Sequence, residues 1–382
     1  MAVTLIYGFG DGLWNFAGRC DNRDTLTFYY AAKGALAGID PYDNPALHQA
    51  YGAFAWWVYP PSALPFFMPL AALSVAQAVI AFNVAKAIAL LGLAVVWCKT
   101  LPALRRDLAF GLFALAALNT TLLQDWCSGN IAIFESLAIW SAVLLVLRQR
   151  YGWAVALVLL ISLIKPLWLA LLLLPLLMAP QQRPARNAAL VSAAIGAAIG
   201  AAIGVALLVL WVALDYPAVV NWLLNLRTTL PIRYNVFELV KDIRVALGGT
   251  ADTPPWQRPE LAFYALWCAA VAWLLWRCWR AGNGLVGMLL LILAIAATSP
   301  ANLSYSWVMV VPIVYRVMLD TTGPWRWAIG VTALLPAPLL GLVLPWRDIG
   351  MVTMISVMLA LVAFALQRPQ RTTRADHDQV EL

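Results

Sequence analysis

The chain has 382 residues, of which 63% are hydrophobic and only 11% charged. A mean hydropathy of +0.80 excludes an ordinary soluble domain, and repeated apolar runs of about 20 residues favour membrane-spanning helices over the alternating strands of a barrel. The formal charge of +7 is therefore interpreted as a topology signal, and no nucleic-acid partner is expected. The predicted fold class is an all-α polytopic membrane protein.

The N-terminal half is expected to contain spans of unequal length. Residues 1–18 are the weakest candidate, because Asp11 and several glycines interrupt the apolar run. Residues 59–75 carry four prolines, which predict a short segment lying against the bundle. Full spans are predicted at 76–98, 108–123 and 131–147, followed by two half-length helices within 151–179 that are broken at Lys165–Pro166.

The C-terminal half continues with a long span at 188–214 and a polar loop at 215–260. Five further spans are predicted at 261–280, 284–298, 303–319, 325–343 and 350–366. More than half of the 25 Lys and Arg residues fall in the short loops on one side of this layout, and the positive-inside rule makes that side cytoplasmic. Residues 1–366 then form one integral membrane domain, its loops 19–58 and 215–260 facing outward, and 367–382 form a cytoplasmic tail.

Several kinds of site are not expected. The five cysteines and two histidines lack the spacing of a zinc site. Neither a Gly-rich phosphate loop followed by Lys-Ser/Thr nor a dinucleotide-binding fingerprint occurs, so a nucleotide-driven enzyme is not expected.

The polar stretch from Asp21 to Pro61 is the candidate active site. It combines aspartates with Tyr and Trp, which hydrogen-bond to sugars and stack on them. Its predicted place on the outer face, beside lipid, favours a lipid-carried substrate. Because a sugar hydroxyl is a poor nucleophile, its attack on an anomeric carbon needs a carboxylate base, and we assign that role to Asp24.

The residues of this stretch resemble the first outer loop of glycosyltransferase family 87, a group of membrane enzymes of the GT-C superfamily. Shorter similarities follow along most of the chain. The residues that carry the resemblance are Asp24, Phe28-Tyr29, Ala31-Ala32, Gly38, Asp40-Pro41-Tyr42, Tyr59-Pro60-Pro61, Pro69-Leu70, Ser128-Gly129-Asn130, Lys165-Pro166 and Ser299-Pro300.

The resemblance implies a GT-C-like bundle of about 10–12 transmembrane helices with outer-face juxtamembrane helices. It implies an inverting transfer of a hexose, mannose in the best-known members, from a polyprenyl-phosphate sugar to a lipid or glycan hydroxyl. Asp24 is then the catalytic base, no metal or other cofactor is required, and the site faces the periplasm or cell exterior from a bacterial inner membrane. The predicted substrate-binding residues are Lys165, Tyr59, Gln124, Asn130, Arg227 and Arg233.

Other interpretations stay open at this point. Asp24 could instead cap a helix starting near Thr25, and Asp21 is an alternative base. Asp21, Asp24, Asp40 and Asp43 could jointly hold a divalent ion, although Asp40–Pro41 and Asp43–Asn44 are typical of turns.

Three further alternatives concern the membrane. Lys165 could have a purely structural role, as the partner of Glu135 in an ion pair. Tyr59 could belong to an interfacial aromatic belt. Lys86 and Asn83 share a helical face and are interpreted as a structural polar contact, or Lys86 as a lysine that snorkels to the membrane surface. For the whole protein, the alternative function is a transporter or flippase of a lipid-linked saccharide.

Overall fold

The computed structural model describes residues 22–52, 57–105, 107–178, part of 187–209, 219–224, 259–280, 284–298 and 304–334. The described residues form helices and no β-strand, which confirms the all-helical prediction. The predicted span at 1–18, most of the span at 188–214, the span at 350–366 and the tail at 367–382 lie outside them, as does most of the loop at 215–260.

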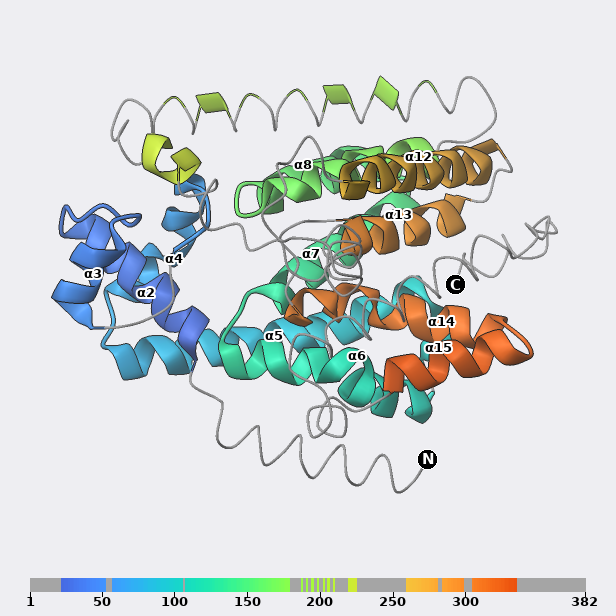
Figure 1. The fold of residues 1–382 in the computed structure, drawn as a ribbon, viewed down its shortest axis with the longest axis horizontal. Coiled ribbons are helices and arrows are strands. Elements are labelled where there is room, and N and C mark those ends of the chain that lie inside the picture. Colours follow the sequence, from blue (N-terminus) through green and yellow to red (C-terminus); the bar gives the residue numbers. More distant parts are fainter. Residues whose placement is uncertain are drawn as a thin grey trace.

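A bundle of apolar helices makes up the main body (Figure 1). Its N-terminal members are α5 (Val75–Thr100), α6 (Leu108–Ser128), α7 (Ala132–Leu147) and α8 (Tyr151–Ser162). Helix α7 packs against both α5 and α8, and this core continues into the C-terminal helices. Those are α12 (Pro259–Arg280), α13 (Gly284–Thr298), η5 (Ser304–Val310), α14 (Val311–Asp320) and α15 (Pro324–Leu334).

Two described helices are long and apolar enough to cross a membrane, namely Val75–Thr100 and Ala262–Arg280. A third candidate is α6, which bends by 63° between Leu108–Leu118 and Thr121–Ser128. Helix α6 also runs to Ser128, beyond the predicted end at 123, so the polar residues just before Gly129 lie on the helix and not in a loop.

Helix α5 agrees closely with the predicted span at 76–98. Ser74 and Gln77 form a capping box at its start, which satisfies two backbone N–H groups that a helix would otherwise leave unpaired. The helix ends at Thr100, and Pro102 opens the short turn η2 (Pro102–Leu104). Its 26 residues correspond to about 39 Å, which exceeds the hydrocarbon thickness of a bilayer.

The predicted break at Lys165–Pro166 is confirmed. Helix α8 ends at Ser162, Lys165 is extended with φ −133° and ψ 103°, and the chain resumes as η3 (Pro166–Leu173) and α9 (Leu174–Met178). Proline disfavours a helical residue before it and lacks an N–H of its own, which explains the interruption.

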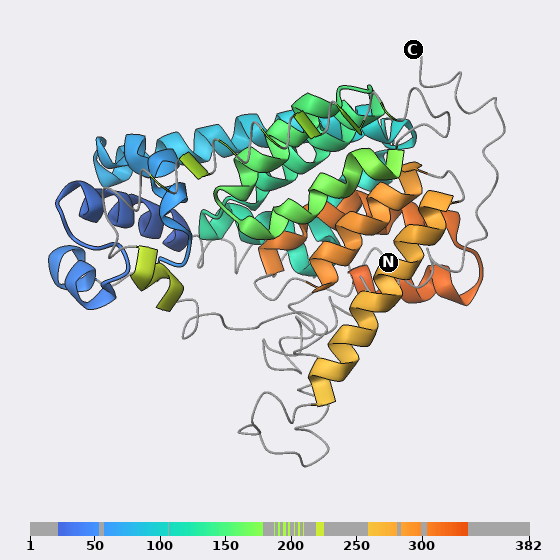
Figure 2. The ribbon, with the colours of Figure 1, turned by 90° about the horizontal axis from the view of Figure 1, so that it is seen from above.

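The N-terminal helices gather at one end of the bundle, away from α14 and α15 (Figures 1 and 2). They are α2 (Arg23–Leu36), α3 (Asn44–Tyr51), η1 (Pro61–Ala63) and α4 (Leu64–Ala71). The proline-rich segment predicted at 59–75 is thus short, as expected.

A separate apolar core fixes α2 against α4 and α5. In it, Phe28 stacks on Phe67 with ring centroids 4.4 Å apart, and Phe82 and Trp57 complete the aromatic contacts. The Tyr29 hydroxyl also donates to Leu73 O at 2.9 Å. Packing on both faces holds the start of α2, and therefore Asp24, in a defined place.

Candidate functional site

Helix α2 begins at Arg23, two residues earlier than the helix-cap interpretation of Asp24 requires. Asn22 is the N-cap, in a left-handed conformation with φ 50°. Its N–H donates to Cys127 O at 3.1 Å, and its side-chain oxygen accepts from Asn83 Nδ2 at 3.3 Å. Asp24 therefore lies in the first turn of the helix, and the capping alternative is wrong.

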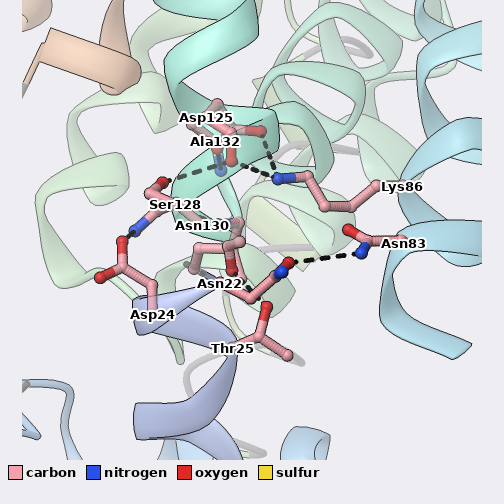
Figure 3. A network of polar contacts seen from close by, with 11 residues as sticks. Asn22, Asp24, Thr25, Asn83, Lys86, Asp125, Ser128, Asn130 and Ala132 are labelled. Atoms are coloured by element: carbon pink, nitrogen blue, oxygen red, sulfur yellow. Dashed lines mark hydrogen bonds and ion pairs between the residues drawn. The ribbon is translucent and has the colours of Figure 1, made fainter. Parts of the chain in front are cut away.

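The Asp24 side chain meets Asn130 across the boundary between α2 and the α6–α7 turn (Figure 3). Asn130 Nδ2 donates to Asp24 Oδ2 at 2.6 Å, and the Arg23 guanidinium lies 3.9 Å from Oδ1. The Asp24 side chain is 13% exposed, whereas Asn130 is buried. A carboxylate held by a buried amide but still reached by solvent is suited to accept a proton from an incoming hydroxyl.

Asn130 owes its position to the way α6 ends. Gly129 has φ +70° and follows the last helical residue, Gly129 N donates to Trp126 O, and Asn130 N donates to Asp125 O, which is the pattern of a Schellman motif. Thr25 Oγ1 donates to Gly129 O at 3.0 Å. A Cβ on Gly129 would lie 2.0 Å from that hydroxyl oxygen, so only glycine allows α2 to approach this closely.

Behind Asn130 lies a fully buried ion pair. Lys86 Nζ of α5 lies 2.9 Å from Asp125 Oδ2 of α6, and both side chains are 0% exposed. The lysine also donates to Asp125 O, while Asp125 Oδ1 accepts from Ala132 N at 3.0 Å. Removal of one partner from such a pair costs about 3–5 kcal/mol, because the other charge stays buried without compensation.

A second ion pair lies at the helix break. Lys165 Nζ lies 2.9 Å from both Glu135 oxygens and 6.0 Å from the centre of the Tyr59 ring. The pairing of Lys165 with Glu135, one of the two sequence interpretations, is therefore present. Lys165 keeps 15% of its side chain exposed, so the pair does not exclude a further contact with a ligand.

Tyr59 lies between the Asp24 carboxylate and the ion pair of Lys165 with Glu135. It is buried among Phe28 and Trp57, and its carbonyl accepts from the Tyr42 hydroxyl at 2.7 Å. Burial raises the pKa of the Tyr59 hydroxyl well above its usual range, and the negative charges of Glu135 and Asp24 raise it further. The phenol therefore stays protonated at neutral pH.

Only some of the remaining predicted site residues lie in the part of the chain that the structure describes. Gln124 is half-buried on α6, next to Asp125, whereas Arg227 and Arg233 lie outside the described residues, as does Asp21. Asp40 Oδ1 accepts from Tyr42 N at 2.9 Å, which is the predicted turn contact. Asp43 Oδ1 accepts from Ala46 N at 3.0 Å, but as the N-cap of α3 and not in an isolated turn.

Sequence reasoning missed the role of Asp125. Lys86 and Asn83 do make structural polar contacts, as predicted, but with different partners: Lys86 pairs with Asp125 and Asn83 donates to Asn22. The snorkelling alternative for Lys86 is wrong, because its side chain is 0% exposed. An isolated lysine inside an apolar run needs an acidic partner on another helix. Asp125, near the end of a neighbouring apolar run, was the available signal.

Metal binding has no support in the described part of the chain. No group of three or more His, Cys, Asp or Glu side chains that could hold an ion occurs among those residues.

Comparison with known proteins adds one finding to this geometry. Neither the curated proteins nor the solved structures contain a match to the chain. A family model, that of glycosyltransferase family 87, matches residues 57–300, which include Asn130, Lys165 and the buried ion pair and begin after Asp24. Because this match covers well over half of the 382 residues, the chain belongs to glycosyltransferase family 87.

Proposed function

We propose that this glycosyltransferase moves a hexose, with mannose as the expected sugar, from a polyprenyl-phosphate donor to a hydroxyl group of a lipid or glycan acceptor. The reaction inverts the anomeric centre and takes place at the outer face of a bacterial inner membrane. The observation that carries the proposal is the partly exposed Asp24 carboxylate, held 2.6 Å from the buried Asn130 amide at one end of an apolar helix bundle.

Asp24 is the proposed base of a single displacement. The acceptor hydroxyl gives its proton to the carboxylate while its oxygen forms a bond to the anomeric carbon. The bond from that carbon to the phosphate oxygen breaks, and polyprenyl phosphate leaves with the electron pair. Asn130 acts by holding one carboxylate oxygen, which orients the side chain for the proton transfer.

Lys165 is the proposed contact for the donor phosphate. Its ammonium group faces Glu135 and the Tyr59 ring, and a phosphate that gains charge as the leaving group forms needs a cation nearby. Gln124, Tyr59 and the two arginines Arg227 and Arg233 remain proposed substrate contacts.

The depth of the site suits a lipid-carried donor. Asn22 contacts Asn83 of α5. Because an α-helix rises about 1.5 Å per residue, Asn83 lies about 12 Å from the start of α5 at Val75. If that end of α5 lies at the outer membrane surface, Asp24 lies close to the level of lipid headgroups. This placement is part of the proposal, as are the GT-C-like bundle of about 10–12 spans and the single domain at 1–366.

Purified protein incubated with a panel of polyprenyl-phosphate sugars tests the proposal through the release of polyprenyl phosphate. Asp24→Asn removes the base while Asn130 keeps a side-chain oxygen to bind, and it should lower turnover by about 100-fold or more with donor binding retained. Turnover should be unchanged by a chelator. Normal turnover of Asp24→Asn would reject the assignment of the base. Movement of intact lipid-linked saccharide without release of polyprenyl phosphate would instead favour a transporter.

A further inference from the structure

The ion pair of Lys86 and Asp125 takes no part in the proposed chemistry, yet it lies directly behind the amide that holds Asp24 (Figure 3). A buried pair gains little net stability over apolar side chains of similar size, because both charges lose their hydration. Stability alone is therefore a weak reason to bury a lysine and an aspartate on facing helices.

Asp125 controls both sides of the turn that carries Asn130. Its main-chain oxygen accepts from Asn130 N at 3.1 Å, which closes the end of α6. Its carboxylate oxygen Oδ1 accepts from Ala132 N at 3.0 Å at the first residue of α7. Lys86 contacts the same residue twice, at the carbonyl and at Oδ2, so one lysine of α5 holds the whole turn in place.

We propose that Lys86 and Asp125 are positioning residues, which fix the turn at Gly129 and Asn130 so that the Asn130 amide meets the Asp24 carboxylate. The inference rests on the proposed function of Asp24 as the base. Because the pair as a whole carries no net charge, its direct effect on Asp24 is that of a dipole, and the inference assigns its main action to the geometry of the turn.

The charged groups around Asp24 come from several elements. Arg23 lies on the same helix as Asp24, and the Lys86–Asp125 pair lies behind Asn130. Glu135 and Lys165 lie beyond Tyr59. A hydrogen bond donated to a carboxylate favours its charged form, so loss of the Asn130 contact makes the base protonate at a higher pH. The acid limb of the pH–rate profile then moves to higher pH.

The test replaces the pair with apolar side chains in the full-length protein. In K86M/D125L, the new leucine side chain cannot accept from Ala132 N, and no charge is left buried alone. We expect kcat to fall roughly 10- to 100-fold while the donor KM changes by less than about twofold. The acid limb should move up by about 0.5–1 pH unit, as it should in N130A, and the triple variant should show no further shift.

The control is Tyr315→Phe in α14, which removes a contact at the opposite end of α6. The Tyr315 hydroxyl donates to Asp107 Oδ2 at 2.6 Å, and Asp107 caps the start of α6. This variant removes a polar contact of α6 without touching the turn at Asn130, so it should lower the thermal midpoint and leave the acid limb unchanged.

The amide pair K86Q/D125N covers the case in which the apolar variant does not fold. Neutral hydrogen bonds are weaker than charge-assisted ones, so its acid limb should lie between those of the wild type and N130A. An acid limb at the wild-type position in a folded pair variant would overturn the inference, as would an equal shift in Tyr315→Phe. Failure of the proposed function is distinct, because Asp24→Asn would then remain active whatever the pair variants do.

Discussion

At the scale of single residues, the site depends on close approach between two chain segments. The start of α2 meets the α6–α7 turn through two neighbouring contacts, one between Asp24 and Asn130 and one between Thr25 and Gly129. Because both contacts hold α2 directly against the turn, a small shift of either segment changes the position of the Asp24 carboxylate. Proton transfer depends on that position.

Gly129→Ala tests this close approach. The new Cβ would lie 2.0 Å from Thr25 Oγ1 and 3.1 Å from Thr25 N, and alanine disfavours the φ of +70°. We expect a loss of about 1–2 kcal/mol in the free energy of unfolding from the backbone alone, and at least about a tenfold loss of kcat because α2 must move away. Thermal unfolding in detergent and a turnover assay measure the two effects.

Gly38→Ala is the matched control for that variant. Gly38 has φ +77°, but a Cβ added there would meet nothing within 4 Å, so alanine brings the same backbone strain without the clash. It should lose similar stability and keep its turnover. Equal losses of turnover in the two variants would show that the contact between α2 and the turn is not what matters.

At the scale of elements, the break between α8 and η3 places a cation between α7 and the segment that carries Tyr59. Lys165 is extended at this break, and its ammonium group reaches Glu135 of α7 and the Tyr59 ring. Sequence predicted this break from Lys165–Pro166, because the effect of proline on its neighbour is local.

Lys165→Ala and Glu135→Gln separate a donor contact from a structural ion pair. If Lys165 binds the donor phosphate, its loss should raise the donor KM roughly 10- to 100-fold and change the acceptor KM far less. Glu135→Gln leaves the lysine without its anionic partner, so the donor KM should stay the same or fall. Equal damage by both variants to donor and acceptor kinetics would identify the pair as structural.

The limits of several elements could be predicted from the sequence, whereas the contacts within the candidate site could not. The limits of α5 follow from its apolar run, Ser74 and Pro102, and the short α4 from its prolines, because these signals act within a few residues. The contact of Asp24 with Asn130 joins residues 106 positions apart, and the Lys86–Asp125 pair joins α5 to α6. Such pairings are set by how helices pack, which no periodicity in the chain records.

At the scale of the whole molecule, the site and the α7–α8 turn lie at opposite ends of the bundle. Helix α7 begins two residues after Asn130 and has 16 residues, so its far end at Arg148 is about 24 Å away. The proposed orientation puts the site end, with α2 and α3, outside the cell and the Arg148 turn in the cytoplasm, in agreement with the basic residues concentrated there.

Labelling of introduced cysteines tests that orientation. Gln49 on α3 and Arg148 after α7 are both exposed, and the free thiols Cys98, Cys268 and Cys278 are only partly exposed, so the unmodified chain sets the background. A membrane-impermeant maleimide should label Gln49→Cys in intact cells, because its side chain faces outward. It should label Arg148→Cys only after permeabilisation. The reverse pattern would place Asp24 on the cytoplasmic side, and the proposed reaction at the outer face would have to be abandoned.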